Sequence, residues 1–121
     1  MSSRQRLPCR RPSITREAVW HRPGGVHRFT VTVGIDPGTR EVREVFASPA
    51  RGSDIDALIA DSCVGISHAL QCGADPIAIA RSMLRVEATV DGEVVELRAS
   101  AFGAIADCVA EVVVWLREGG P

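Results

Sequence analysis

Residues 25–85 carry an unbroken series of local folding signals, and this series limits the chain to a mixed α+β fold. In order, it contains an alternating strand at 27–33, a turn at 36–38, a second strand at 42–48, and helices that begin near 53 and 75. Each signal agrees with its neighbours, which is typical of a sequence that folds to one structure. We therefore expect these residues to form the centre of a folded domain.

The first of these strands has one apolar face. That face holds His27, Phe29, Val31 and Val33. A period of two suits an antiparallel strand with one buried side. The segment Asp36-Pro37-Gly38 has turn chemistry, because proline presets φ and glycine tolerates positive φ. The strand is therefore predicted to turn back towards the strand at 42–48.

The two helices that follow have recognisable ends. Ser53 is the expected N-cap of the first helix, and Gly73 is its expected stop. At helical spacing the inward stripe of the first helix contains Ile55, Leu58, Ile59, Ile66, Ala69 and Leu70. Asp75-Pro76 begins the second helix as N-cap and first helical residue. Its inward residues are expected to be Ile79, Ala80, Met83 and Leu84.

The C-terminal part of the chain predicts a hairpin and a third helix. Asp91-Gly92 lies between two β-favouring runs, 87–90 and 93–98, and this pair is typical of a type I′ turn. Ser100 is the expected cap of a helix whose apolar stripe contains Phe102, Ile105, Val109, Val112, Val113 and Leu116. The predicted fold is α+β with the order ββααββα, two antiparallel hairpins packed with three helices over residues 23–121.

An ordered set of residues in this chain resembles a known family. The matching positions are Gly25, 28–34, Glu44-Val45-Phe46, Gly52-Ser53, Ile66-Ser67, Ala69-Leu70, Gly73, Asp75-Pro76, Ile79, Arg81-Ser82, 99–104 and Asp107. Together they resemble the TSCPD domain, which is found at the C-terminal end of adenosylcobalamin-dependent (class II) ribonucleotide reductases and as small free-standing bacterial proteins. The Thr-Ser-Cys-Pro-Asp string that names the domain is absent from this chain. Metal binding by its cysteine therefore does not transfer.

The resemblance implies a peripheral part of such an enzyme. A chain of 121 residues is too short for the ten-stranded reductase barrel, and its cysteines lack the radical constellation. We therefore expect a non-catalytic accessory or ligand- or partner-binding module linked to deoxyribonucleotide synthesis, with no catalytic residue and no cofactor. A ribonucleotide reductase or another protein is the expected partner. An independent enzyme is the third choice, after nucleic-acid binding.

Charge is divided unevenly along the sequence. Residues 1–28 hold seven Arg and one Glu, a balance of +6, whereas residues 29–121 have a balance of −7. Residues 1–22 also contain Pro8 and Pro12 and show little apolar periodicity, so we expect a basic, disordered arm. Its candidates for binding nucleic-acid phosphates or an acidic protein are Arg4, Arg6, Arg10, Arg11 and Arg16. The alternative is a solvated tail, because no aromatic side chain is interleaved within this arginine cluster to stack on bases.

A second candidate anion site precedes the first helix. The free amides of a helix N-terminus favour an anion, and Arg51, Gly52 and Ser53 lie at this point. The alternative is simple capping, because Asp54 and Asp56 already complement the helix dipole.

The cysteines and histidines favour structural roles over chemistry. Cys63 and Cys72 lie nine residues apart on one helix and cannot chelate a metal jointly, so no metal site is expected. Buried, inert thiols are the main expectation, and Cys72 is the alternative redox candidate because it lies near a helix end. His27 is expected at the edge of the core, and His68 is expected at an interface.

The apolar residues exceed what a single core needs, which predicts self-association as a homodimer. The interface candidates are Ala57, Ala60, Val64, His68, Val114 and Trp115. Trp115 is the expected anchor, because large aromatic residues dominate interface energetics. The alternative is that these side chains cover one another within one chain. No apolar run is long enough for a membrane helix and no secretory signal is present, so a cytoplasmic location is expected.

Overall fold

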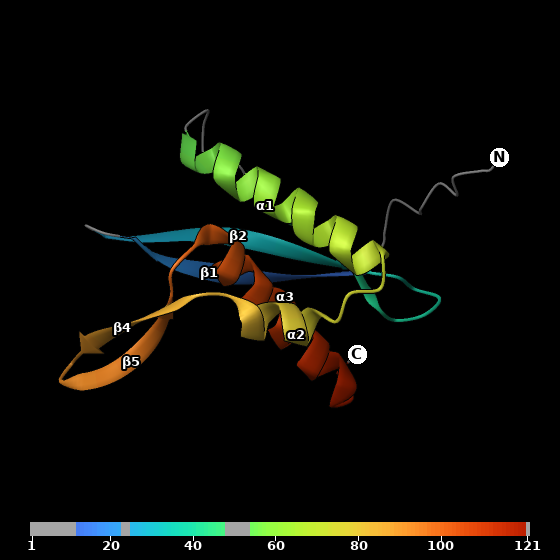
Figure 1. Ribbon diagram of the computed structural model, residues 1–121. Coiled ribbons are helices and arrows are strands. Elements are labelled where there is room, and N and C mark those ends of the chain that lie inside the picture. Colours follow the sequence, from blue (N-terminus) through green and yellow to red (C-terminus); the bar gives the residue numbers. More distant parts are fainter. Residues whose placement is uncertain (1–11, 23–24, 48–53, 121) are drawn as a thin grey trace.

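Three antiparallel strands in the order β1-β2-β3 form the central sheet of the protein (Figure 1). The computed structural model describes residues 12–22, 25–47 and 54–120. The strands are β1 (Ser13–Arg22), β2 (Gly25–Ile35) and β3 (Val42–Ala47). The central strand β2 turns Phe29, Val31 and Val33 into the core, as its alternation predicts. The turn after β2 is closed by Asp36, whose Oδ1 accepts from the amide of Gly38 at 2.8 Å.

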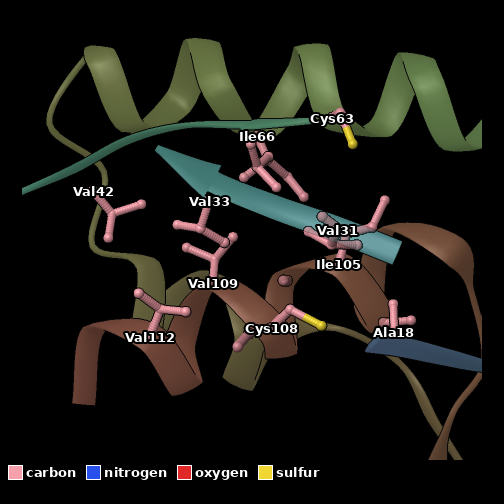
Figure 2. Close-up of a cluster of buried hydrophobic side chains, with 14 of the residues drawn as sticks. Ala18, Val31, Val33, Val42, Cys63, Ile66, Ile105, Cys108, Val109 and Val112 are labelled. Atoms are coloured by element: carbon pink, nitrogen blue, oxygen red, sulfur yellow. The ribbon is translucent and has the colours of Figure 1, made fainter. Parts of the chain in front are cut away.

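Two long helices complete the core on the inward side of this sheet. α1 (Asp54–Gln71) runs along β3, and α3 (Ala101–Arg117) lies against β1 and β2. Figure 2 shows side chains from α1, β2 and α3 pointing towards one another, among them Ile66, Val31 and Ile105. Burial of such aliphatic side chains is the main source of the stability of the domain.

The first strand corrects the prediction of a disordered arm over residues 1–22. Ser13–Arg22 is β1, and every one of its residues has an antiparallel partner on β2, from Ser13 opposite Gly34 to Arg22 opposite Gly25. The α+β class is confirmed, but the order is βββααββα and the first unit is a three-stranded sheet instead of a hairpin. The folded domain therefore begins by Pro12, and residues 1–11 lie outside the described part of the chain.

α1 has a narrower buried stripe than predicted. Its buried apolar residues are Ile59, Cys63, Ile66 and Leu70. Their alternating spacing of four and three residues keeps them on one side of the helix. Leu58 was expected inward, but its direction differs from that of Ile59 by one helical step, and it is 54% exposed. Gly73 has a φ of 91°, as expected for the residue that ends a helix.

The short helix α2 (Pro76–Ser82) leads into the hairpin of β4 (Arg85–Val90) and β5 (Glu93–Arg98). Asp75 caps α2 by accepting from the amide of Ile77 at 3.0 Å, as predicted. The type I′ turn is confirmed, because both Asp91 and Gly92 have positive φ. Leu84 was expected to face inward from α2, but it lies beyond the helix and is 72% exposed. Figure 1 shows the hairpin projecting from the body of the domain.

The last helix matches its prediction closely. Ser100 caps α3 by accepting from the amide of Gly103 at 3.0 Å. The stripe is buried at Ile105, Val109, Val112 and Val113, whereas Phe102 and Leu116 are half-buried at its edges. This helix therefore contributes more buried residues to the core than α1 does.

Candidate interaction surfaces

An open depression lies between α3, the base of the β4–β5 hairpin and β1. Its volume is about 660 Å³. The apolar residues that line it are Val19, Ile77, Leu97, Ala110, Val114 and Trp115. The charged residues at its edge include the carboxylates Glu96, Glu111 and Glu118 and the guanidinium of Arg85. The depression therefore combines an apolar floor with a rim that carries more negative than positive charge.

Trp115 is held in place by the end of the chain that follows α3. The amide of Gly120 donates to the carbonyl of Trp115 at 3.0 Å. A Cβ atom on Gly120 would lie 2.5 Å from the indole ring, so glycine is needed for this close approach. Arg40 Nη2 donates to the carbonyl of Gly120 at 3.0 Å and fastens this segment to the loop before β3. The half-buried ring is thus packed on one side while it lines the depression.

The predicted interface residues lie on two separate surfaces. Val114 and Trp115 line the depression beside α3. Ala60, Val64 and His68 are exposed on α1 and line a different groove of about 370 Å³ along β3. Ala57 is also exposed on α1. The sequence pattern identified exposed apolar positions, but it did not show that they form two surfaces.

Side chains of α1 cover the outer edge of β3. Ser67 Oγ accepts from the amide of Val45 at 3.0 Å, and it lies 3.3 Å from the carbonyl of the same residue. Gln71 Nε2 donates to the carbonyl of Arg43 at 3.2 Å. Backbone groups that would otherwise be free at a sheet edge are therefore bonded, and this part of the edge is blocked for another strand.

The predicted anion-binding residues are largely beyond the described segments. Arg51, Gly52 and Ser53 lie outside them, as do Arg4, Arg6, Arg10 and Arg11. Arg16, the last candidate of the arm, is instead a half-buried residue of β1 opposite Val31. Arg22 and Arg28 also belong to the sheet: Arg22 lies 5.0 Å above the Trp20 ring, and Arg28 pairs with Glu17 at 2.9 Å.

Of the three cysteines in the described segments, two occupy the buried environment that was mainly expected, and the redox candidate Cys72 does not. Cys63 and Cys108 are buried, and Cys72 is exposed. Burial raises the pKa of the Cys63 thiol to about 11. Burial, with smaller contributions from Glu111 and Asp107, raises the pKa of Cys108 to about 12. Both buried thiols are therefore protonated at neutral pH and are poor nucleophiles.

His27 lies in an aromatic row at the edge of the core, as expected. Its ring is 6.3 Å from that of Trp20 and 5.8 Å from that of Phe29. The indole Nε1 of Trp20 donates to the carbonyl of Ala99 at 3.2 Å. This row joins β1 and β2 to the segment between the hairpin and α3.

Comparisons with known proteins identified no relative of this chain. No family model, curated protein or solved structure matches the chain. Within residues 12–22, 25–47 and 54–120, no cluster of three or more His, Cys, Asp or Glu side chains has the arrangement of a metal site. In the same segments no helix combines the length and apolar character needed to cross a membrane.

Proposed function

We propose that this protein is a non-catalytic module that binds another protein through the depression beside α3. The observation that carries the proposal is the placement of Val114 and Trp115 together in an apolar depression of about 660 Å³. An aromatic anchor in an apolar centre, surrounded by a polar rim, is the usual arrangement of a protein interface. The resemblance to the TSCPD domain supports the choice of partner, a ribonucleotide reductase, and the link to deoxyribonucleotide synthesis.

The rim of the depression indicates which surface would bind there. Arg98 and Asp107 form an ion pair, and Arg85 Nε lies 3.8 Å from Glu96 Oε2. Glu111 and Glu118 add two further negative charges. A complementary partner would present an apolar side chain flanked by Lys or Arg. Since rim charges act mainly on association, higher salt should slow the binding of such a partner.

The proposal is tested by measuring the affinity of the purified chain for the ribonucleotide reductase of its own source. Trp115→Ala should weaken binding by about thirtyfold, because hot-spot aromatics contribute about 2 kcal/mol or more. Val114→Asp places a charge on the same floor at a residue that is 41% exposed, so it should weaken binding without unfolding the protein.

Val64→Asp on α1 is the matched control, because Val64 is 56% exposed and lines the other groove. It should leave the affinity unchanged. The proposed site would be refuted if the chain did not bind the reductase, or if Val64→Asp weakened binding as much as Trp115→Ala and Val114→Asp do. Turnover of a ribonucleotide by the isolated chain, supplied with adenosylcobalamin and a dithiol, would refute its non-catalytic character.

Nucleic-acid binding is the second candidate function, and the balance of +6 over residues 1–28 favours it. Because β1 is part of the sheet, the truncation that tests it must stop at residue 11. Removing residues 1–11 should abolish binding to DNA, since it removes Arg4, Arg6, Arg10 and Arg11. The affinity of the full chain for DNA should fall about tenfold for each doubling of the salt concentration, as expected for four phosphate contacts. Unchanged DNA binding after this truncation would show that the folded domain, and not the segment 1–11, binds DNA.

A further inference from the structure

Within the described residues, β4 is an edge strand whose outer side pairs with no other strand. Backbone groups on the outer edge of β3 form hydrogen bonds with the side chains of Ser67 and Gln71 on α1, and β1 lies beside α3 and β5. Among the described strands, β4 pairs with β5 alone. An edge strand with apolar residues and free backbone groups is a template for pairing with another chain. A projecting two-stranded hairpin is also marginal by itself, whereas a sheet with more strands is stable.

The hydrogen bonds at the base of the hairpin show which backbone groups face outwards. The carbonyl of Leu84 accepts from the amide of Ala99 at 3.2 Å. Residues along an antiparallel strand alternate between bonded and outward positions. Val86, Ala88 and Val90 therefore bond to β5, and the amides and carbonyls of Arg85, Glu87 and Thr89 point away from the hairpin.

We propose that β4 pairs antiparallel with β4 of a second copy, about a twofold axis at Val86. In this register Arg85 lies opposite Glu87 of the second copy, and Glu87 lies opposite its Arg85. Both pairs use outward-facing backbone groups, and both join opposite charges. A shift of the axis by one residue, to Glu87, would place two carboxylates directly opposite each other, which is unfavourable. The edge is thus self-complementary in one register.

The charges within the hairpin support a second copy as the occupant. The register of β4 and β5 places Glu87 opposite Glu96, and Arg85 opposite Arg98. Arg98 is neutralised by Asp107, and Arg85 lies near Glu96. Within the described segments the Glu87 side chain forms no ion pair or hydrogen bond. Arg85 of a second copy would supply the positive charge that this carboxylate lacks.

The apolar face of the hairpin points to the same arrangement. Leu84 is 72% exposed and Val86 is 43% exposed. The proposed register brings Val86 of the two copies together and places Leu84 beside Ala88 of the other copy. On this side a groove of about 490 Å³ separates Val86 and Ala88 from Val26 at the end of the β1–β2 pair. Pairing would join the two-stranded hairpins of the two copies into one four-stranded sheet with a continuous apolar face.

The test uses full-length protein and charge reversal. At micromolar concentration the wild-type chain should have twice the mass of one chain by light scattering. Glu87→Arg should raise the dissociation constant of the dimer by about thirtyfold, because both symmetric pairs become repulsive. Within one chain, the arginine introduced at position 87 lies opposite Glu96. The hairpin of the variant should therefore be at least as stable as that of the wild-type chain. Thermal unfolding of the variant checks that the fold is retained.

The double variant Arg85→Glu with Glu87→Arg restores opposite charges across the twofold axis and should restore the dimer. Val64→Asp, on the outer surface of α1, should leave the dimer intact. A monomeric wild-type protein, or a Glu87→Arg variant that remains fully dimeric, would overturn the proposal. Dissociation caused by Val64→Asp would assign the dimer interface to α1 and overturn it as well.

Discussion

Replacing Ile66 with alanine is expected to lower the free energy of unfolding by about 3 kcal/mol. Ile66 is 1% exposed, and its side chain extends from α1 towards β2 and α3 (Figure 2). Its neighbours Val31 and Ile105 are fully buried in well-packed elements. The core therefore cannot collapse easily into the space that the smaller side chain leaves. Chemical denaturation, followed by circular dichroism, measures the loss.

Leu58→Ala on the same helix is the matched control. The sequence predicted both residues on the inward stripe, but Leu58 is 54% exposed. Its truncation should change the free energy of unfolding by less than about 1 kcal/mol, as for most surface substitutions. Similar losses for the two variants would show that α1 packs on a different face from the one described.

The elements that sequence reasoning predicted well have local causes. The cap of α3 at Ser100, the cap of α2 at Asp75 and the turn at Asp91-Gly92 each depend on atoms a few residues apart. Side-chain caps and positive-φ turns act at this range, so neighbouring residues suffice to specify them. The period of α3 was equally clear, because Ile105, Val109, Val112 and Val113 recur at helical spacing and are all buried.

β1 could not be predicted in this way because its causes are distant in the sequence. Its inward positions include Arg16 and Ala18, which blur the alternation expected of a strand. Ala18 is nevertheless 1% exposed, and Trp20 bonds to Ala99, which is 79 residues away. β1 is therefore specified by the partners that it packs against. Without these partners, the basic residues of β1 and the prolines that precede it favour disorder, which is why the sequence pattern predicted an arm.

The candidate surfaces also combine features that local sequence patterns predict with features that depend on the tertiary fold. Exposed apolar residues such as Val64 and Val114 were identified from the helical pattern alone. Their separation onto two surfaces depends on how α1 and α3 cross the sheet, which no local pattern specifies. The sequence did not assign an open edge to β4 in particular, because Leu84 was predicted on the preceding helix and the strand was predicted to begin at Glu87, although Leu84, Val86, Ala88 and Val90 alternate.

An ion pair between a buried arginine and a half-buried aspartate fixes the base of the projecting hairpin. Arg98, the last residue of β5, is 8% exposed. Its Nε and Nη2 donate to the two carboxylate oxygens of Asp107 on α3. Its Nη1 donates to the carbonyl of Met83, just before β4, at 3.3 Å. The guanidinium thus ties both ends of the hairpin to α3, and the orientation of β4 towards a second copy depends on it.

Asp107→Ala is therefore expected to lower the free energy of unfolding by about 3 kcal/mol, because it leaves the buried Arg98 charge without a counterion. Replacing both partners, with Arg98→Met and Asp107→Leu, should recover most of this loss, since apolar residues of similar volume need no counterion. Arg28→Ala is the control: it breaks the exposed Arg28–Glu17 pair and should cost less than about 1 kcal/mol. Chemical denaturation of the four proteins gives the comparison. If Asp107→Ala cost no more than Arg28→Ala, the Arg98–Asp107 pair would contribute no more than a surface contact, and the hairpin would be held by its apolar contacts alone.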